Sequence, residues 1–128
     1  MIYKVVASIL ILLTFLTNVY GSNLKASWYS IESLKKEGTW KTTKGVMANG
    51  DHFVDYNYTC ASRMHKLGDV LRVTCTKTNR SCIVTVTDRI GYRFRYTRID
   101  LSKQAFKEIA NLDEGVIDIT IEVIRWTN

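Results

Sequence analysis

The sequence predicts a mainly β fold, a small barrel or sandwich with one short α-helix, on two kinds of periodicity. Residues 70–76, 81–87 and 116–126 alternate apolar and polar side chains, as half-buried strands do. Residues 102–111 instead space their apolar side chains along one face of a helix. The alternating runs outnumber the helical one, so the chain is expected to fold around a sheet.

The remaining elements are predicted from residue composition and from turn and capping residues. Residues 24–29 are expected to form the first strand, and residues 31–44, which are rich in lysine and marked by glycine, a short helical turn and a loop. Ser102 is the natural N-cap of the helix, and Asn111 stands at its end. The chain then turns at residues 113–115, before the last strand.

The two central strands are predicted to pair as a hairpin whose buried side chains are Leu71, Val73, Cys75, Cys82, Val84 and Val86. A turn around residues 77–80 would place Cys75 directly opposite Cys82. A disulfide between them is then allowed, and the spacing leaves open whether it forms. Cys60 is interpreted as a free structural thiol.

The composition is that of one modest globular domain. The 128 residues are 46% hydrophobic and carry 18 Lys and Arg against 12 Asp and Glu, a formal net charge of +6. That composition excludes a disordered chain, and the absence of proline excludes collagen-like repeats and proline-rich linkers. The positive charge favours an anionic partner: a wall polymer, a membrane surface or nucleic acid.

Residues 1–21 are predicted to be a signal peptide, and residues 22–128 one domain. Lys4 precedes an apolar run over residues 5–16, which is shorter than the roughly 20 residues that span a bilayer, and Gly21 is small enough for cleavage after it. The alternative is an uncleaved N-terminal anchor, which would be the only membrane contact. The protein is therefore expected in the periplasm, the cell envelope or the extracellular space.

Three acids stand where the backbone is expected to turn, and they are the candidate catalytic residues: Asp51, Asp88 and Asp100. Asp88 continues the buried phase of its strand, and partial burial would keep it protonated, as a general acid requires. The alternative is that each aspartate caps a backbone amide or, for Asp88, pairs with Arg89.

Aromatic side chains near arginines indicate a surface that grips a polymer. Trp28, Tyr29 and Trp40 lie in the first third of the chain, and aromatic residues alternate with arginine over residues 92–98. Single-stranded nucleic acid and a charged glycan both fit such a surface. Export favours the glycan, so no nucleic-acid partner is expected, while Trp28 and Trp126, which lie within strands, are better explained as core residues.

No metal or cofactor is expected. The two histidines, His52 and His65, are far apart in sequence and have no cysteine or histidine partners at zinc-ligand spacing. Carboxylates are then the remaining candidates for catalysis.

Six blocks of sequence, in order, carry a family resemblance: ASWYS at 26–30, MANGDHF at 47–53, TCAS at 59–62, LGDVLRVT at 67–74, VTVTDR at 84–89 and RIDLSKQAFKEIA at 98–110. They resemble the RlpA-like (rare lipoprotein A) double-psi β-barrel family. The resemblance implies a six-stranded double-psi β-barrel with one short α-helix. It also implies an activity like that of the septal ring lytic transglycosylases, which act on peptidoglycan. Related barrels include the expansins, which loosen walls without hydrolysing glycan.

The resemblance also assigns roles. Asp88 matches the acid of the family's Asp-Arg-Gly-Pro motif, Asp51 the glutamate of Ala-Asn-Gly-Glu, and Asp100 the acid of Ile-Asp-Leu-Ser, which is essential in expansin-like relatives. Ser62 replaces a family histidine, and residues 90–91 are Ile-Gly in place of Gly-Pro. The serine strengthens the alternative of a non-catalytic, expansin-like module that binds or loosens the wall.

The predicted function is an exported, monomeric lytic transglycosylase that cleaves MurNAc–GlcNAc strands to 1,6-anhydro ends. Asp88 is the predicted acid and base, while Asp51 and Asp100 position the substrate or adjust Asp88. The residues expected to contact the glycan are Trp28, Tyr29, Trp40, Asn49, Ser62, Arg63, Arg89 and Arg98. A third interpretation is a protein that binds anionic polymers through its basic face alone.

Overall fold

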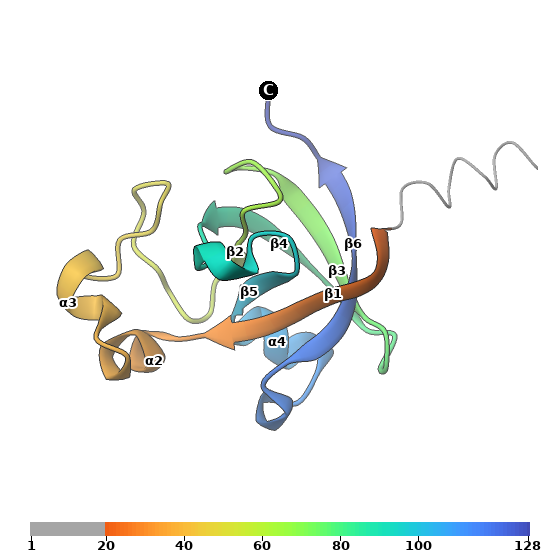
Figure 1. Ribbon diagram of the computed structural model, residues 1–128, viewed down its shortest axis with the longest axis horizontal. Coiled ribbons are helices and arrows are strands. Elements are labelled where there is room, and N and C mark those ends of the chain that lie inside the picture. Colours follow the sequence, from red (N-terminus) through yellow and green to blue (C-terminus); the bar gives the residue numbers. More distant parts are fainter. Residues whose placement is uncertain (1–19) are drawn as a thin grey trace, which may run out of the picture.

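The fold is mainly β, as the sequence predicts, and its strands close into a barrel (Figure 1). The computed structural model describes the backbone of residues 20–128 and the side chains from residue 23 onward. Six strands follow one another around the barrel in the order β1-β5-β2-β4-β3-β6. They are β1 (Tyr20–Tyr29), β2 (Thr59–Ala61), β3 (Val70–Cys75), β4 (Ser81–Asp88), β5 (Arg98–Ser102) and β6 (Ile117–Arg125).

The pairing of the strands is mixed. β1 runs parallel to β5, and β2 runs parallel to β4, whereas the remaining neighbours are antiparallel. Two parallel pairs interleaved in one closed sheet confirm the six-stranded double-psi barrel that the resemblance implies. Closure also leaves no sheet edge exposed to pair with other chains.

The barrel interior is the main hydrophobic core. The six side chains predicted to face inward from the central hairpin are all buried, and so are Ile117, Ile119 and Ile121 of β6. Helix α4 (Lys103–Ile109) begins at Ser102, whose hydroxyl accepts a hydrogen bond from the Ala105 amide at 3.3 Å. Phe106 of this helix is fully buried against the barrel, which is worth about 2–3 kcal/mol of burial free energy.

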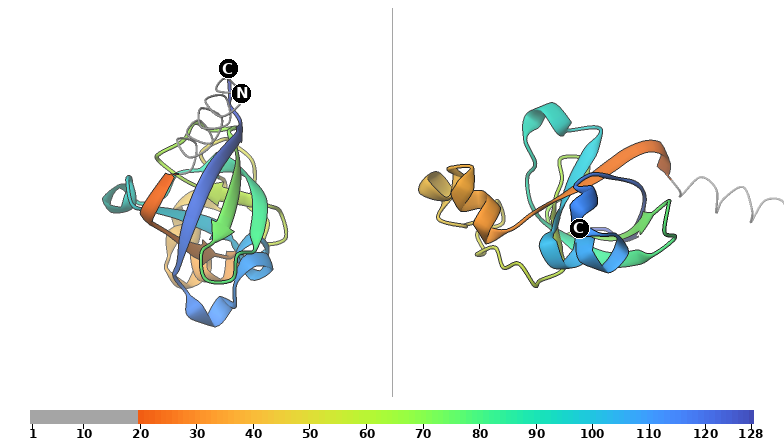
Figure 2. Two further views of the ribbon diagram at one scale, coloured as in Figure 1. Left: turned by 90° about the vertical axis from the view of Figure 1, so that its right-hand side faces the viewer. Right: turned by 90° about the horizontal axis from the view of Figure 1, so that it is seen from below.

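Two short helices form a lobe at one end of the barrel, directly after β1 (Figures 1 and 2). They are α2 (Ile31–Lys36) and α3 (Thr39–Thr43). Ser30 and Ser33 form a capping box that begins α2, and the Ile31 amide donates to the Asp55 carboxylate at 2.8 Å. Two 3-10 turns, η1 (Tyr92–Phe94) and η2 (Leu112–Glu114), complete the fold.

The register of the central hairpin differs from the prediction. Val73 pairs with Cys82 and Thr74 with Ser81, so six residues separate the last paired positions instead of the four expected, and Asn79 takes the left-handed conformation among them. Cys75, the last residue of β3, therefore does not lie opposite Cys82, and all three cysteines are free. The disulfide that the spacing left open does not form in this register.

An irregularity in β4 changes which of its last residues faces inward. Cys60 pairs with Val86 but the next residue, Ala61, pairs with Asp88, so Thr87 is an extra residue on β4. Thr87 is buried, and Asp88 is only half-buried. Such a bulge re-aims the following side chain. Asp88 thus points into a site at the barrel's end rather than into the core.

Parts of the sequence predictions lie beyond this description. Of the predicted leader, residues 1–19 are outside the described residues, and Tyr20 and Gly21 stand at the start of β1. Within residues 20–128, no helix is long and apolar enough to cross a membrane. The described part of the chain also holds no group of three potential metal ligands.

Candidate active site

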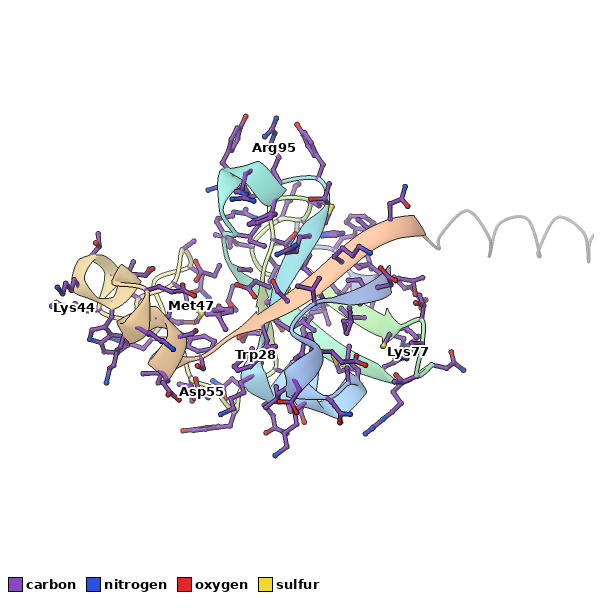
Figure 3. All side chains as sticks on the ribbon, turned by 60° about the horizontal axis from the view of Figure 1, so that its bottom comes forward. Trp28, Lys44, Met47, Asp55, Lys77 and Arg95 are labelled. Carbon is purple, nitrogen blue, oxygen red and sulfur yellow. The ribbon has the colours of Figure 1, made fainter. Side chains whose placement is uncertain are left out.

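A cleft of about 430 Å³ lies between the barrel and the lobe. From the barrel it is lined by Ser27, Tyr29, Ala61, Asp88, Arg89 and Asp100, and from the lobe and the loop after it by Leu34, Glu37, Thr43, Gly45 and Phe53. The volume is within the range of small-ligand sites. Figure 3 shows labelled Met47 between the lobe and the barrel.

The strand register brings two of the three predicted acids into this cleft. Ser27 pairs with Asp100, Asp100 with Ala61, and Ala61 with Asp88, so these four residues form one row across β1, β5, β2 and β4. Asp88 and Asp100 are two strands apart, which places their Cα atoms about 10 Å from each other. Ala61 between them has only a methyl side chain. The two carboxyl groups therefore face the same space with nothing large between them.

Asp100 is the cleft acid whose pKa is shifted by its surroundings. Burial raises its pKa to about 7, the Ser27 hydroxyl donates a hydrogen bond at 3.1 Å that opposes the rise, and the nearby charges of Glu37 and Asp88 add to it. Arg98 acts in the opposite direction. A carboxyl group that titrates near neutral pH is suited to donate a proton.

Asp88 is held by backbone amides. Its Oδ1 accepts hydrogen bonds from the amides of Arg89 at 2.9 Å and Ala48 at 3.0 Å. Ala48 belongs to a tight turn over residues 47–51, which the Asn49 amide fixes to the Thr87 carbonyl at 3.1 Å. The orientation of Asp88 thus depends on a turn that lies about 40 residues away in sequence.

Tyr29 brings a buried hydroxyl to the acids. Its ring stacks on Phe53, with 4.2 Å between the ring centroids, and its hydroxyl lies near the Asp88 carboxylate without a well-formed hydrogen bond. Burial, followed by the charges of Asp88 and Asp100, raises the pKa of this phenol. Tyr29 is therefore a neutral hydrogen-bond donor beside both carboxyl groups.

Of the other predicted site residues, some lie at the cleft and others do not. Arg89 lines the cleft, although its Nη1 already donates to the carbonyls of Ser62 and His65, each at 2.6 Å. Trp28 borders the cleft, but its ring packs against Phe106 and its Nε1 donates to the Leu112 carbonyl at 3.1 Å, so the ring belongs to the barrel core. Ser62 is fully buried outside the cleft, where its hydroxyl accepts from the Met64 amide at 3.1 Å. A direct glycan contact by Ser62 therefore has no support in the structure.

The remaining predicted residues lie outside the cleft lining. Asp51 and Asn49 are exposed and hydrogen-bond each other within the 47–51 turn. They stabilise the turn whose Ala48 amide donates to Asp88. Trp40 packs against Gly45 within the lobe. Arg63 and Arg98 stack on aromatic rings of the segment between β4 and β5.

Among the cleft residues not predicted from the sequence, Ser27 and Glu37 act on Asp100. Ser27 lies two residues before Tyr29, so the alternation of β1 already placed both on one side of the strand and was a usable signal. Glu37 reaches the cleft because it follows α2, and its charge acts on Asp100. No local pattern marks Glu37, since its position depends on how the lobe folds back.

Sequence comparison relates this chain to lytic transglycosylase-like proteins. A family model described as "Lytic transglycolase" matches residues 21–121. The chain is 34% identical over 100 residues to a probable endolytic peptidoglycan transglycosylase RlpA of Aquifex aeolicus, and 37% identical over 75 residues to an uncharacterized protein, ssl3177, of Synechocystis. The alignments cover 78% and 59% of this chain, and 40% and 78% of those proteins, respectively. The chain thus spans less than half of the Aquifex protein.

Comparisons of structure show the same fold. The Streptomyces papain inhibitor matches with a TM-score of 0.59 and 24% identity over 81% of this chain and 94% of that one. A mutant Clavibacter michiganensis expansin in complex with cellohexaose matches with a TM-score of 0.56 and 19% identity, over 80% of this chain and 49% of that one. With the barrel topology, the ordered motifs and the family match in agreement, this chain belongs to the RlpA-like family of lytic transglycosylase-like double-psi β-barrels.

Proposed function

We propose that the cleft cleaves peptidoglycan glycan strands by lytic transglycosylation, at the bond from MurNAc to GlcNAc, leaving 1,6-anhydro ends. One observation carries the proposal: Asp88 and Asp100 face one space across the small side chain of Ala61. The relatives named as probable endolytic peptidoglycan transglycosylases support the choice of substrate. The site of action is then outside the cytoplasmic membrane, where an exported monomer meets the wall.

The proton donor in this proposal is Asp100. It protonates the glycosidic oxygen, the bond from that oxygen to C1 of MurNAc breaks, and the 6-hydroxyl of the same MurNAc forms a new bond to C1. The hydroxyl proton passes to Asp88, and exchange with solvent restores both groups. No water enters the product. The sequence analysis predicted Asp88 as both the general acid and the general base. Here the acid role goes to Asp100, because its pKa is raised to about 7.

Neighbouring residues then have supporting roles. The Ala48 and Arg89 amides orient Asp88, and the Tyr29 hydroxyl, which lies beside both acids, donates to a sugar oxygen in this proposal.

The test is a digest of purified sacculi, with anhydro-muropeptides counted by mass spectrometry. Asp88→Asn and Asp100→Asn are each expected to lower product release about 10²- to 10⁴-fold, because each removes one proton-transfer group. Asp113→Asn is the matched control, since Asp113 is exposed and lies outside the cleft. Release that is unchanged in both cleft variants would overturn the proposal.

The pH profile separates the two acids. With Asp100 as donor, release by the wild type falls as the pH rises above about 7, because the donor loses its proton. Residual activity of Asp100→Asn lacks this limb. A limb that is retained in Asp100→Asn and lost in Asp88→Asn would return the donor role to Asp88.

The second candidate is an expansin-like module that binds or loosens the wall without cleavage. The fold shared with an expansin that was crystallised with cellohexaose favours it, as does Ser62 in place of the family histidine. The digest decides between the two. Binding to sacculi with no soluble anhydro product identifies the binding module.

A further inference from the structure

The segment over residues 91–98, between β4 and β5, projects from the side of the barrel and is here called the arginine arm. Figure 2 shows it standing out in both views, and Figure 3 shows Arg95 at its outer end. The arm begins at the cleft, because Ile90 and Gly91 line that cavity. A flat surface that approaches this side of the molecule therefore meets the arm before it meets the barrel.

The arm has a fixed backbone. The Phe94 amide donates to the Gly91 carbonyl at 2.9 Å, and the Thr97 amide donates to the Phe94 carbonyl at 3.1 Å. The Lys25 amide of β1 donates to the Thr97 carbonyl at 3.0 Å. Phe94 packs on the smaller core, which includes Tyr29. A partner of the arm thus meets a preorganised surface, which reduces the entropy lost on binding.

Two tyrosines form the outer surface of the arm. Tyr92 and Tyr96 are 65% and 72% exposed. The Arg95 guanidinium lies over both rings, 4.2 Å from the centroid of Tyr92 and 4.9 Å from that of Tyr96, and its Nη1 donates to the Tyr92 carbonyl at 3.1 Å. Arg95 is half-buried, so it holds the two rings in place while the rings remain open to solvent.

The arm carries positive charge without a compensating acid. Residues 89–99 include four arginines and no aspartate or glutamate. Arg93 is exposed on the arm, and Arg63, which is exposed just after β2, lies 5.6 Å from the Tyr92 ring. Neither Arg63 nor Arg93 forms an ion pair among the described residues. Their charge is therefore available to a partner.

Exposed tyrosine beside unpaired arginine suits the headgroup region of an anionic bilayer. Tyrosine is amphipathic, and at that level its ring meets the apolar boundary while its hydroxyl stays among polar groups. Guanidinium groups bind phosphate through parallel hydrogen bonds and are attracted by the negative surface potential. Because the arm projects, its rings reach this region while the barrel stays in water (Figure 2).

We infer that the arginine arm docks on a membrane surface that contains anionic phospholipid. Tyr92 and Tyr96 enter the headgroup region, and Arg63 and Arg93 bind the lipid phosphates. A bilayer fits better than a soluble polyanion, because the arm is a convex tip, whereas a polymer chain is bound along a groove. Docking holds the cleft beside the bilayer, since the arm begins there.

This inference goes beyond the proposed function and does not depend on the chemistry of the cleft. The sequence analysis expected membrane contact only through an uncleaved leader. The arm adds a contact that the folded domain itself provides.

Co-sedimentation of the full chain with vesicles tests the inference. The vesicles contain either phosphatidylcholine alone or equal parts of phosphatidylcholine and phosphatidylglycerol. Wild type is expected to bind the anionic vesicles more tightly, and Arg93→Gln to lower that affinity about fivefold, the effect of one basic residue near an anionic surface. Tyr92→Ser combined with Tyr96→Ser is expected to lower it roughly tenfold, because two rings no longer enter the interface.

Matched variants control for charge, exposure and folding. Arg80→Gln removes the same charge from an exposed position on the β3–β4 turn, and Tyr56→Ser removes a ring that is 73% exposed outside the arm. Both are expected to bind like the wild type, as is Arg93→Lys, which keeps the charge. Residues 1–19 are common to all variants, so any lipid binding by them cancels when variants are compared on the same vesicles. Circular dichroism verifies that the variants are folded.

Three results would overturn the inference. The first is equal affinity of the wild type for both kinds of vesicle, and the second is an equal loss in Arg80→Gln and Arg93→Gln. The third is that inorganic polyphosphate binds with the same dependence on Arg93 while the double tyrosine variant binds vesicles like the wild type, which identifies a site for a soluble polyanion. Release of anhydro product has no part in these measurements, so the arm's role and the proposed function stand or fail separately.

Discussion

Asp69 and Asp100 show how hydrogen bonds decide the charge of a buried carboxyl group. Burial opposes ionisation of both. Asp69 nevertheless has a lowered pKa, because its oxygens accept from the Thr127 amide at 2.7 Å and the Lys66 amide at 3.1 Å. Asp100 accepts one bond, from Ser27, and its pKa is raised to about 7. Asp69 anchors the C-terminal segment through the Thr127 amide, while Asp100 remains available for proton transfer.

The raised pKa of Asp100 predicts how stability depends on pH. The folded protein holds this proton more tightly than an unfolded aspartic acid, whose pKa is about 3.9, so the stabilisation is complete below about pH 4 and is lost as the pH rises through 7. Asp100→Asn should therefore gain stability relative to wild type between pH 4 and 8, by at most about 1.4 kcal/mol per pH unit.

Urea denaturation at several pH values measures this difference. Groups common to both proteins cancel in the comparison, so only Asp100 contributes to the change with pH. A difference between the two proteins that is the same at pH 4 and pH 8 would contradict the assignment.

At the scale of elements, the lobe helix α3 is held in place by one glycine. Gly45 is buried with φ +79°, and a Cβ atom there would lie 2.6 Å from the Trp40 ring. Its carbonyl accepts from the Phe53 amide at 2.8 Å, which joins the lobe to the loop that carries the tight turn. The far wall of the cleft thus depends on a position where only glycine fits.

Gly45→Ala is expected to lower the free energy of unfolding by about 2–4 kcal/mol, since it adds a steric clash to left-handed strain. Gly115→Ala is the control, because Gly115 also has positive φ, +70°, but faces open space. It should cost only about 1–2 kcal/mol. Equal losses in thermal unfolding of the two variants would show that Trp40 does not restrict this site.

The strand register predicts how the thiols of β2, β3 and β4 react. Cys60, Cys75 and Cys82 are free and buried. Burial and the neighbouring Cys82 raise the pKa of Cys60, and burial followed by Glu108 raises the pKa of Cys82 to about 12. Native protein is therefore expected to react at least tenfold more slowly with iodoacetamide than protein in denaturant, where all three thiols are labelled. A Cys75–Cys82 disulfide after air oxidation would contradict this register.

At the scale of the whole molecule, barrel closure builds the site. β2 and β5 are short strands of three and five residues, yet β2 lies between β4 and β5 and brings Asp88 and Asp100 to either side of Ala61. Four arginines, Arg63, Arg93, Arg95 and Arg98, lie over the aromatic rings of the segment between β4 and β5, which begins at the cleft. One small domain thus combines a site for proton transfer with a charged surface beside it.

The periodic elements were predictable. Each of these elements buries one face, which gives a periodic pattern of apolar residues in the sequence. They are the helix capped by Ser102 and the strands predicted over residues 70–76, 81–87 and 116–126. β2 was not found from periodicity because all three of its residues are buried and nothing alternates. The six motif blocks supplied the topology that periodicity lacked.

The sequence by itself determined a mainly β domain, its helix and the identity of two cleft acids, because side-chain periodicity and short motifs are local properties. Only the tertiary structure decided the two-residue longer hairpin turn, the bulge at Thr87, the exclusion of Ser62 from the cleft and the raised pKa of Asp100. Each of these depends on register and burial, which arise from contacts between strands distant in sequence and so are not encoded at any one position.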